Sequence, residues 1–137
     1  MNNSEAMMQR ITVCYPTGSL AEQVDRWAEG REEYLVEPVF ARTAVGIRRS
    51  LSGAVLALVD ASEDHEQAID LFSQAVARLG AQRVSVYTEQ MHEGLERFVR
   101  TQGSWLLLGP LTDKQWEDYF STLLPEERRP ALRRRAA

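Results

Sequence analysis

Five short runs of apolar and β-branched residues alternate along the chain with five segments in which apolar residues recur at helical spacing. The strand candidates are residues 11–15, 34–40, 53–60, 83–88 and 104–108. The helix candidates that follow them are residues 19–28, 41–52, 65–79, 91–103 and 112–124. Ser19 can cap the first of these helices, and Thr112 with Gln115 three residues later predicts a capping box at the start of the last. This alternation predicts parallel strands joined by right-handed helical crossovers, with helices on both faces of one sheet.

Two strand candidates indicate their own places in the sheet. The run from Ala54 to Val59 is apolar without interruption and ends at Asp60, as in a central strand covered on both faces. Pro38 lies within the second run, which favours an edge position because proline lacks an N–H donor. We therefore expect an α/β fold of three layers, a doubly wound, parallel, five-stranded sheet with the flavodoxin-like order 2-1-3-4-5.

Composition limits the number of domains and the kinds of partner. The chain of 137 residues is long enough for one domain. We expect a polar N-terminal segment over 1–10, the α/β domain over 11–124, and an Arg-rich tail over 125–137. That tail is either solvated or docks to an acidic partner, RNA or a membrane surface. Residues 1–124 carry 18 acidic and 11 basic groups, a net charge of −7. This charge argues against a nucleic-acid partner.

The sequence also limits the compartment and the cofactors. The polar start has no apolar core of a signal peptide, and the longest apolar run is too short to span a bilayer. One cysteine and two histidines are too few for a disulfide framework or a structural zinc site. We expect a cytoplasmic protein with no metal, no cofactor and no membrane partner.

Candidate functional residues stand where the predicted strands end. Asp60 ends the third strand, Thr88 ends the fourth, and Gly109 with Pro110 follows the fifth. The carboxyl ends of parallel strands form the crevice in which doubly wound sheets bind ligands. This arrangement resembles a response-regulator receiver domain over residues 11–124. The resemblance implies a signalling fold whose phosphoacceptor aspartate, hydroxyl residue and Lys-Pro motif occupy these three places.

The sequence departs from the receiver pattern at two places where receivers carry charged residues. Tyr15, Pro16 and Thr17 stand where receivers carry a magnesium-binding acidic pair, and Gly109 stands where they carry a lysine. The one lysine of the chain, Lys114, lies in the last predicted helix. Magnesium needs several hard oxygen ligands, and phosphoryl transfer needs neutralisation of charge. The resemblance therefore implies a degenerate pseudo-receiver with a vestigial site and no enzymatic activity.

The leading hypothesis is a non-enzymatic regulatory module that binds a protein partner or forms a homodimer. The resemblance implies contact through the face built by the fourth helix, fifth strand and fifth helix. The interface candidates on that face are Met91, Leu95, Trp105, Trp116 and Phe120.

Three alternatives assign other roles to the same edge of the sheet. Asp60 could remain a phosphoacceptor, with Thr88 gating the switch. Thr17, Gly18 and Ser19 are similar to the phosphate loop of flavodoxins, and amides at a helix start bind anions. That similarity implies a small FMN or nucleotide binder. Asp60 could also be an ordinary acid that caps the following loop or helix.

Overall fold

The computed structural model describes residues 9–40 and 44–124. The predicted Arg-rich tail and nearly all of the predicted polar N-terminal segment lie outside the described residues. The strands are β1 (Gln9–Cys14), β2 (Tyr34–Val39), β3 (Ala54–Asp60), β4 (Val84–Thr88) and β5 (Trp105–Leu108). The helices are α2 (Gly18–Ala28), α3 (Ala44–Leu51), α4 (His65–Leu79), the short 3₁₀ helix η1 (Ala81–Arg83), α5 (Glu93–Thr101) and α6 (Asp113–Leu123).

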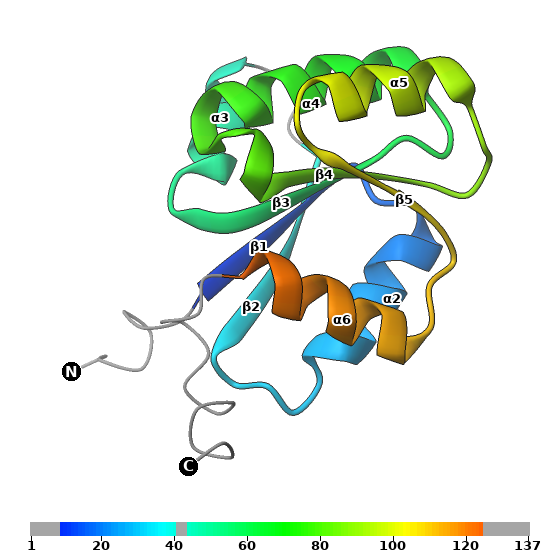
Figure 1. Cartoon of the computed structure of the whole chain (residues 1–137). Helices are drawn as coiled ribbons and strands as arrows, with labels where there is room; N and C mark the ends of the chain where they lie inside the picture. The colour runs from blue at the N-terminus through cyan, green and yellow to red at the C-terminus, as the bar shows by residue number, and fades with distance from the viewer. Residues whose placement is uncertain (1–8, 41–43, 125–137) are drawn as a thin grey trace.

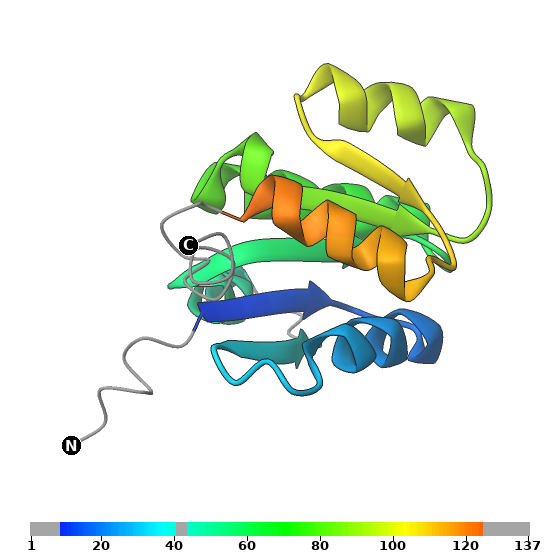
Figure 2. The same cartoon turned by 60° about the horizontal axis from the view of Figure 1, so that its bottom comes forward.

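All five strands pair in parallel in the order β2-β1-β3-β4-β5, which confirms the predicted topology. Helices α3, α4 and α5 cover one face of the sheet, and α2 and α6 cover the other (Figures 1 and 2). Every residue of β3 is buried, as expected for a central strand. Strand β2, which contains Pro38, lies at an edge as predicted. Within the described residues, no helix is long and apolar enough to cross a membrane.

The first strand and helix differ in detail from the sequence prediction. Strand β1 ends at Cys14 because Tyr15 turns the chain with a φ of 50°. Helix α2 begins at Gly18 with Thr17 in the N-cap position. Sequence reasoning placed the cap at Ser19. The Thr17 side chain makes no capping hydrogen bond, because its hydroxyl is used elsewhere, as described below.

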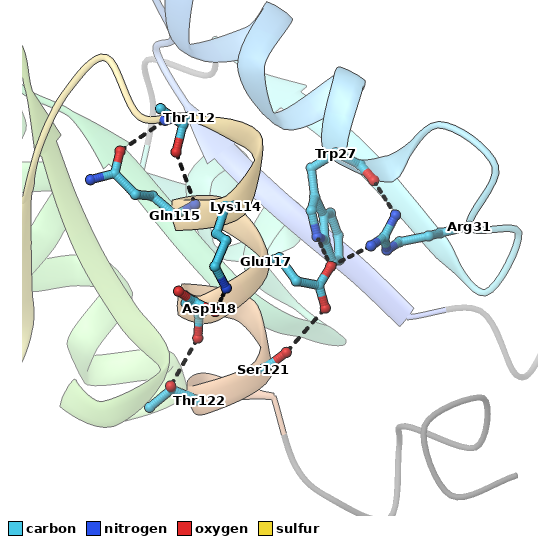
Figure 3. Close-up of polar contacts among 9 residues, drawn as sticks. All are labelled: Trp27, Arg31, Thr112, Lys114, Gln115, Glu117, Asp118, Ser121 and Thr122. Carbon is cyan, nitrogen blue, oxygen red and sulfur yellow. Dashed lines mark hydrogen bonds and ion pairs between the residues drawn. The ribbon is translucent and has the colours of Figure 1, made fainter. Parts of the chain in front are cut away.

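Other helix starts are stabilised by side chains. Asp64 accepts a hydrogen bond from the Gln67 N–H at the start of α4, and His92 Nδ1 accepts one from the Leu95 N–H at the start of α5. At the start of α6, the side chains of Thr112 and Gln115 each accept from the other residue's backbone N–H (Figure 3). This reciprocal capping box is the one that the sequence predicts.

Helices α2 and α6 pack through stacked rings and a polar seam beside them. The rings of Trp27 and Phe120 stack with centroids 3.9 Å apart. Glu117 accepts hydrogen bonds from Trp27 Nε1, Ser121 and the Arg31 guanidinium (Figure 3). Partial burial by itself raises the pKa of the Glu117 carboxyl. The hydrogen bonds from these donors and the charge of Arg31 lower it by more, so the pKa lies below its usual value. The carboxylate of Glu117 therefore stabilises the folded state.

We predict that Glu117→Gln lowers stability modestly and in a pH-dependent way. A lowered folded-state pKa gives a contribution that is complete above the unfolded pKa, about 4.3, and is lost as the pH falls through the folded value. The side chain is 42% exposed, so solvent screening limits the loss near neutral pH to less than about 1 kcal/mol. Urea unfolding of both proteins at several pH values measures the difference.

The matched control is Asp118→Asn. Asp118 is more exposed, and its one ion pair within the described residues is with Lys114 one turn away, so its replacement should change stability little at any pH. A difference between Glu117→Gln and the parent that stays constant down to acid pH would contradict the role assigned to the Glu117 carboxylate.

Candidate functional site

Asp60 ends β3 at the carboxyl edge of the sheet and is only 6% exposed. Its Oδ2 atom accepts hydrogen bonds from the Thr17 N–H at 2.7 Å and from the Thr17 hydroxyl at 2.9 Å. Its Oδ1 atom accepts from the Ser62 N–H at 2.9 Å. Three of the roughly four acceptor positions of the carboxylate are thus filled from within the chain. Asp60 ties the β1–α2 loop to the β3–α4 loop.

Thr88 ends β4 and is fully buried. Its hydroxyl donates to the Gln90 carbonyl at 3.1 Å and accepts from the Gln90 N–H at 3.3 Å. In the same loop, the Glu89 N–H donates to the Ser62 hydroxyl at 3.2 Å. The β4–α5 loop is therefore held to its own strand and to the loop that carries Asp60.

Gly109 follows β5 and lies against the side chain of Tyr87. Its N–H donates to the Thr88 carbonyl at 2.9 Å, and its peptide bond to Pro110 is cis. A Cβ atom on Gly109 would lie 2.2 Å from Tyr87 Cε2 and 2.4 Å from its hydroxyl oxygen. Nonbonded carbon atoms pack at about 3.5–4.0 Å, so no side chain fits at this position while the Tyr87 ring is in place.

The Tyr87 hydroxyl belongs to a buried polar network centred on Gln23. It accepts from Gln23 Nε2 at 2.8 Å and donates to the Glu89 carboxylate at 2.6 Å. Gln23 Oε1 accepts from the Leu111 N–H and from Trp116 Nε1. Burial, followed by the hydrogen bond to Glu89, raises the pKa of Tyr87 to about 12, so the hydroxyl stays protonated. The network joins α2, β4 and α6.

Sequence reasoning singled out neither Gln23 nor Tyr87. One signal was present, because Gln23 falls in the buried stripe of α2 that also holds Leu20, Val24 and Trp27. A glutamine at a core position needs partners for its amide. Nothing in the sequence indicates that Tyr87 is one of them.

The residues at this edge do not fit a magnesium ion. After β1, Tyr15 and Thr17 have no carboxylate, and their hydroxyl groups donate to the Phe40 carbonyl and to Asp60. Across residues 9–40 and 44–124, no three His, Cys, Asp or Glu side chains gather as a metal-binding group. Lys114 forms an exposed pair with Asp118 one turn along α6 (Figure 3).

The candidate anion-binding loop is also engaged internally. Gly18 begins α2, and the Thr17 N–H and hydroxyl both donate to Asp60. The Ser19 hydroxyl accepts from Gln23 Nε2 at 3.0 Å. A bound anion would have to compete with the Asp60 carboxylate for the donors of Thr17.

Three of the five predicted interface residues were wrongly assigned. Leu95, Trp116 and Phe120 are at most 2% exposed and pack in the core. Helical periodicity marks the side of a helix that packs on the sheet, and these residues lie on that side. Met91 and Trp105 are exposed, as an interface requires, and so is Leu108, which the sequence analysis did not include.

Comparison with known proteins identifies the fold. No family model matches the chain, and no curated protein sequence does. A pilus assembly protein CpaE from Caulobacter crescentus is similar in structure, with a TM-score of 0.61, 15% identity, and coverage of 85% of this chain and 94% of that one. A response regulator protein from Burkholderia multivorans gives a TM-score of 0.61 at 16% identity, with coverage of 85% and 95%. The chain therefore has a receiver-like fold.

We predict that Gly109→Ala destabilises the protein by about 1–3 kcal/mol, because its methyl group would overlap the Tyr87 ring. Tyr87→Ala removes that ring and should cost about 3–5 kcal/mol by itself. The double variant should be less destabilised than the two single effects combined. Urea unfolding of the four proteins measures this coupling.

Gly94→Ala is the matched control. Gly94 lies in the exposed first turn of α5, where an added Cβ atom would lie 3.3 Å from His92 Cε1 and would not overlap it as it overlaps Tyr87 at Gly109, so alanine should change stability little. Strictly additive effects of the Gly109 and Tyr87 substitutions would contradict the direct overlap.

Proposed function

We propose that this chain is a regulatory protein-interaction module with a receiver-like fold that performs no phosphoryl transfer. The observation that carries the proposal is the engagement of the Asp60 carboxylate by Thr17 and Ser62. A phosphoacceptor carboxylate must present one oxygen to the incoming phosphorus. Here Oδ2 already accepts two hydrogen bonds and Oδ1 accepts one.

The charges around Asp60 support the same proposal. Phosphoryl transfer is accelerated chiefly by cations that neutralise the equatorial oxygens. The receiver family uses an acidic pair to hold magnesium, and a lysine. The equivalent positions here are Tyr15 to Thr17 and Gly109, which offer neither a metal-binding carboxylate nor a cation. Even an accessible Asp60 would therefore react slowly.

Binding is proposed to use the flank of the domain formed by α5, β5 and α6, which we call the α5–β5–α6 face. Met91, Trp105 and Leu108 are exposed large apolar side chains on or beside these elements. Exposed apolar groups that gather on one side of a domain are typical of protein-binding surfaces. The proposed ligand of this face is therefore a protein partner or a second copy of the chain. We propose that binding takes place in the cytoplasm and does not involve nucleic acid.

The name of one structural neighbour, a pilus assembly protein, agrees with a domain that works through contacts with other proteins. At 15% identity, this similarity does not specify the partner of the present chain. The proposal therefore concerns how the domain acts, by binding a protein without catalysis, and does not name the partner.

We predict that acetyl phosphate with Mg²⁺ leaves the intact mass of the protein unchanged. The physical reason is that the Asp60 carboxylate is engaged, and that the described positions equivalent to the receiver site, Tyr15 to Thr17 and Gly109, supply neither a cation nor a metal-binding carboxylate. A receiver domain with its acidic pair and lysine, treated in parallel, is the positive control and should gain one phosphoryl group.

Two variants make the opposite result interpretable. A mass gain of one phosphoryl group that disappears in Asp60→Asn and persists in Asp64→Asn would identify Asp60 as a phosphoacceptor and overturn the proposal. Asp64 is a matched control because it is a nearby acid whose side chain caps α4.

A further inference from the structure

Three exposed arginines on two neighbouring helices have no partner of opposite charge. Most other basic side chains form ion pairs or donate to backbone carbonyls of the domain, namely Arg10, Arg26, Arg31, Arg83, Arg100 and Lys114. Arg48 and Arg49 of α3 and Arg78 of α4 are exposed and form no ion pair within residues 9–40 and 44–124. We call these three residues the α3–α4 arginines.

Arg78 lies on the flank of α4 that faces α3. Helices α3 and α4 pack side by side on one face of the sheet (Figure 1). On the other flank of α4, the rings of His65 and Phe72 contact rings of α5. Helical spacing places Arg78 opposite these two residues, so its side chain extends from α4 toward α3.

Arg48 lies on the flank of α3 that faces α4. Ile47 is buried against the sheet, and the next residue of a helix projects about 100° further round the axis. Along α4, the same step from the buried Ala75 leads to Val76, which lies on the flank toward α5. Both helices follow their strands through the same right-handed crossover, so the step from Ile47 leads toward α4. Near the last turns of the two helices, Arg48 and Arg78 therefore face each other.

No carboxylate of these two helices neutralises the α3–α4 arginines. Helix α3 contains no acidic residue. The nearest acid before Arg78 on α4 is Asp70, about 12 Å away along the helix axis, and it accepts a hydrogen bond from Gln74 Nε2 at 3.1 Å. Like charges that face each other repel, and an anion between them removes the repulsion. The groove between α3 and α4 thus offers positive charge to a ligand.

We propose that the α3–α4 arginines bind a phosphoryl group carried by a side chain of a protein partner. A phosphate monoester carries nearly two negative charges at neutral pH and has three acceptor oxygens. Guanidinium groups match these oxygens with paired N–H donors, and clusters of arginines recognise phosphorylated segments. Long side chains on a helix lean toward its N-terminus, so both guanidinium groups extend away from the last carbonyls. The site goes beyond the proposed function, because α4 separates it from the α5–β5–α6 face.

Exposed apolar side chains beside the site favour a phosphoryl group that belongs to a protein. Val45, which is 55% exposed, lies one turn before Arg49 on the outer surface of α3. Phe40, which is 59% exposed, follows β2. Residues that flank a phosphorylated side chain could cover this apolar surface. The net charge of −7 over residues 1–124 disfavours an extended polyanion such as nucleic acid or an anionic bilayer.

Titration of the full chain with inorganic phosphate, at an ionic strength held constant with chloride and followed by amide NMR, tests the site. We expect saturable shifts of the amide signals of residues 48–52 and 76–80. Arg48→Gln and Arg78→Gln should each raise the dissociation constant about tenfold or more, because each removes one of two charged donors. The matched control is Arg97→Gln on α5, which makes the same change of net charge and should bind phosphate like the parent.

A pair of peptides distinguishes a protein-borne phosphoryl group from free phosphate. Both have one sequence, with leucines around a central serine that is phosphorylated in one peptide only. The phosphorylated peptide should bind more tightly than inorganic phosphate, and the unmodified peptide should not bind. Val45→Ser should weaken binding of the phosphorylated peptide and leave binding of inorganic phosphate unchanged. Equal affinities for the phosphorylated peptide and inorganic phosphate would overturn the protein partner and assign the site to free phosphate.

A charge reversal tests the facing arginines through stability. Saturating phosphate should raise the urea midpoint of the parent, because a ligand that binds only the folded state stabilises it. Arg78→Glu places a carboxylate opposite Arg48, so phosphate should no longer raise the midpoint. Arg97→Glu should respond to phosphate like the parent. Circular dichroism verifies that each variant is folded.

The outcomes also separate this inference from the proposed function. Shifts that do not saturate, or that are the same in Arg48→Gln and Arg78→Gln as in the parent, overturn the site. Saturable shifts confined to residues 17–19 would assign phosphate to the loop after β1 and overturn it as well. Either result leaves a binding module at the α5–β5–α6 face standing. Phosphorylation of Asp60 overturns the proposed non-catalytic function without changing how the α3–α4 arginines bind phosphate.

Discussion

The hydrogen bonds from Thr17 and Ser62 to the Asp60 carboxylate hold together the loops at the carboxyl edge of the sheet. An almost fully buried carboxylate is tolerated only when donors replace its lost water, and hydrogen bonds to a charged group contribute about 1.5–3 kcal/mol each. Here the donors come from the β1–α2 loop and the β3–α4 loop. The Ser62 hydroxyl then fixes the β4–α5 loop through the Glu89 N–H. The geometry of the edge therefore depends on a charge that is satisfied from within the chain.

Aromatic and amide groups fill the remaining space at this edge. The Tyr87 ring lies against Gly109, and its hydroxyl joins Gln23 and Glu89. In a doubly wound sheet, the carboxyl edge is where ligands usually bind. In this chain the groups at that edge bind one another, and two exposed large apolar residues, Trp105 and Leu108, lie on β5. For these reasons the binding surface is proposed on the α5–β5–α6 face and not in the crevice.

The fold could be predicted from the sequence because each element carries a local signal. The apolar run at 54–59 indicated a central strand, Pro38 an edge, and Thr112 with Gln115 a helix start. The contacts of the site could not be predicted in the same way. The Thr17–Asp60 bond joins residues 43 positions apart, and just before Thr17 the chain turns at Tyr15 with a φ of 50°. The periodicity of apolar residues shows which side of a helix is buried, but not whether the core of the domain or a partner buries it. Leu95, Trp116 and Phe120 were therefore assigned to an interface although they pack in the core.

The central claim is that Asp60 is a structural tie and no longer accessible to magnesium and a phosphoryl group. Amide NMR of the full chain, recorded during addition of Mg²⁺ and then beryllofluoride as a phosphoryl analogue, tests it most directly. The account predicts that the amide signals of Thr17, Ser62 and Gly109 stay in place throughout. Saturable shifts of these three signals would contradict it, because they would show that Asp60 releases Thr17 to bind the metal and the analogue.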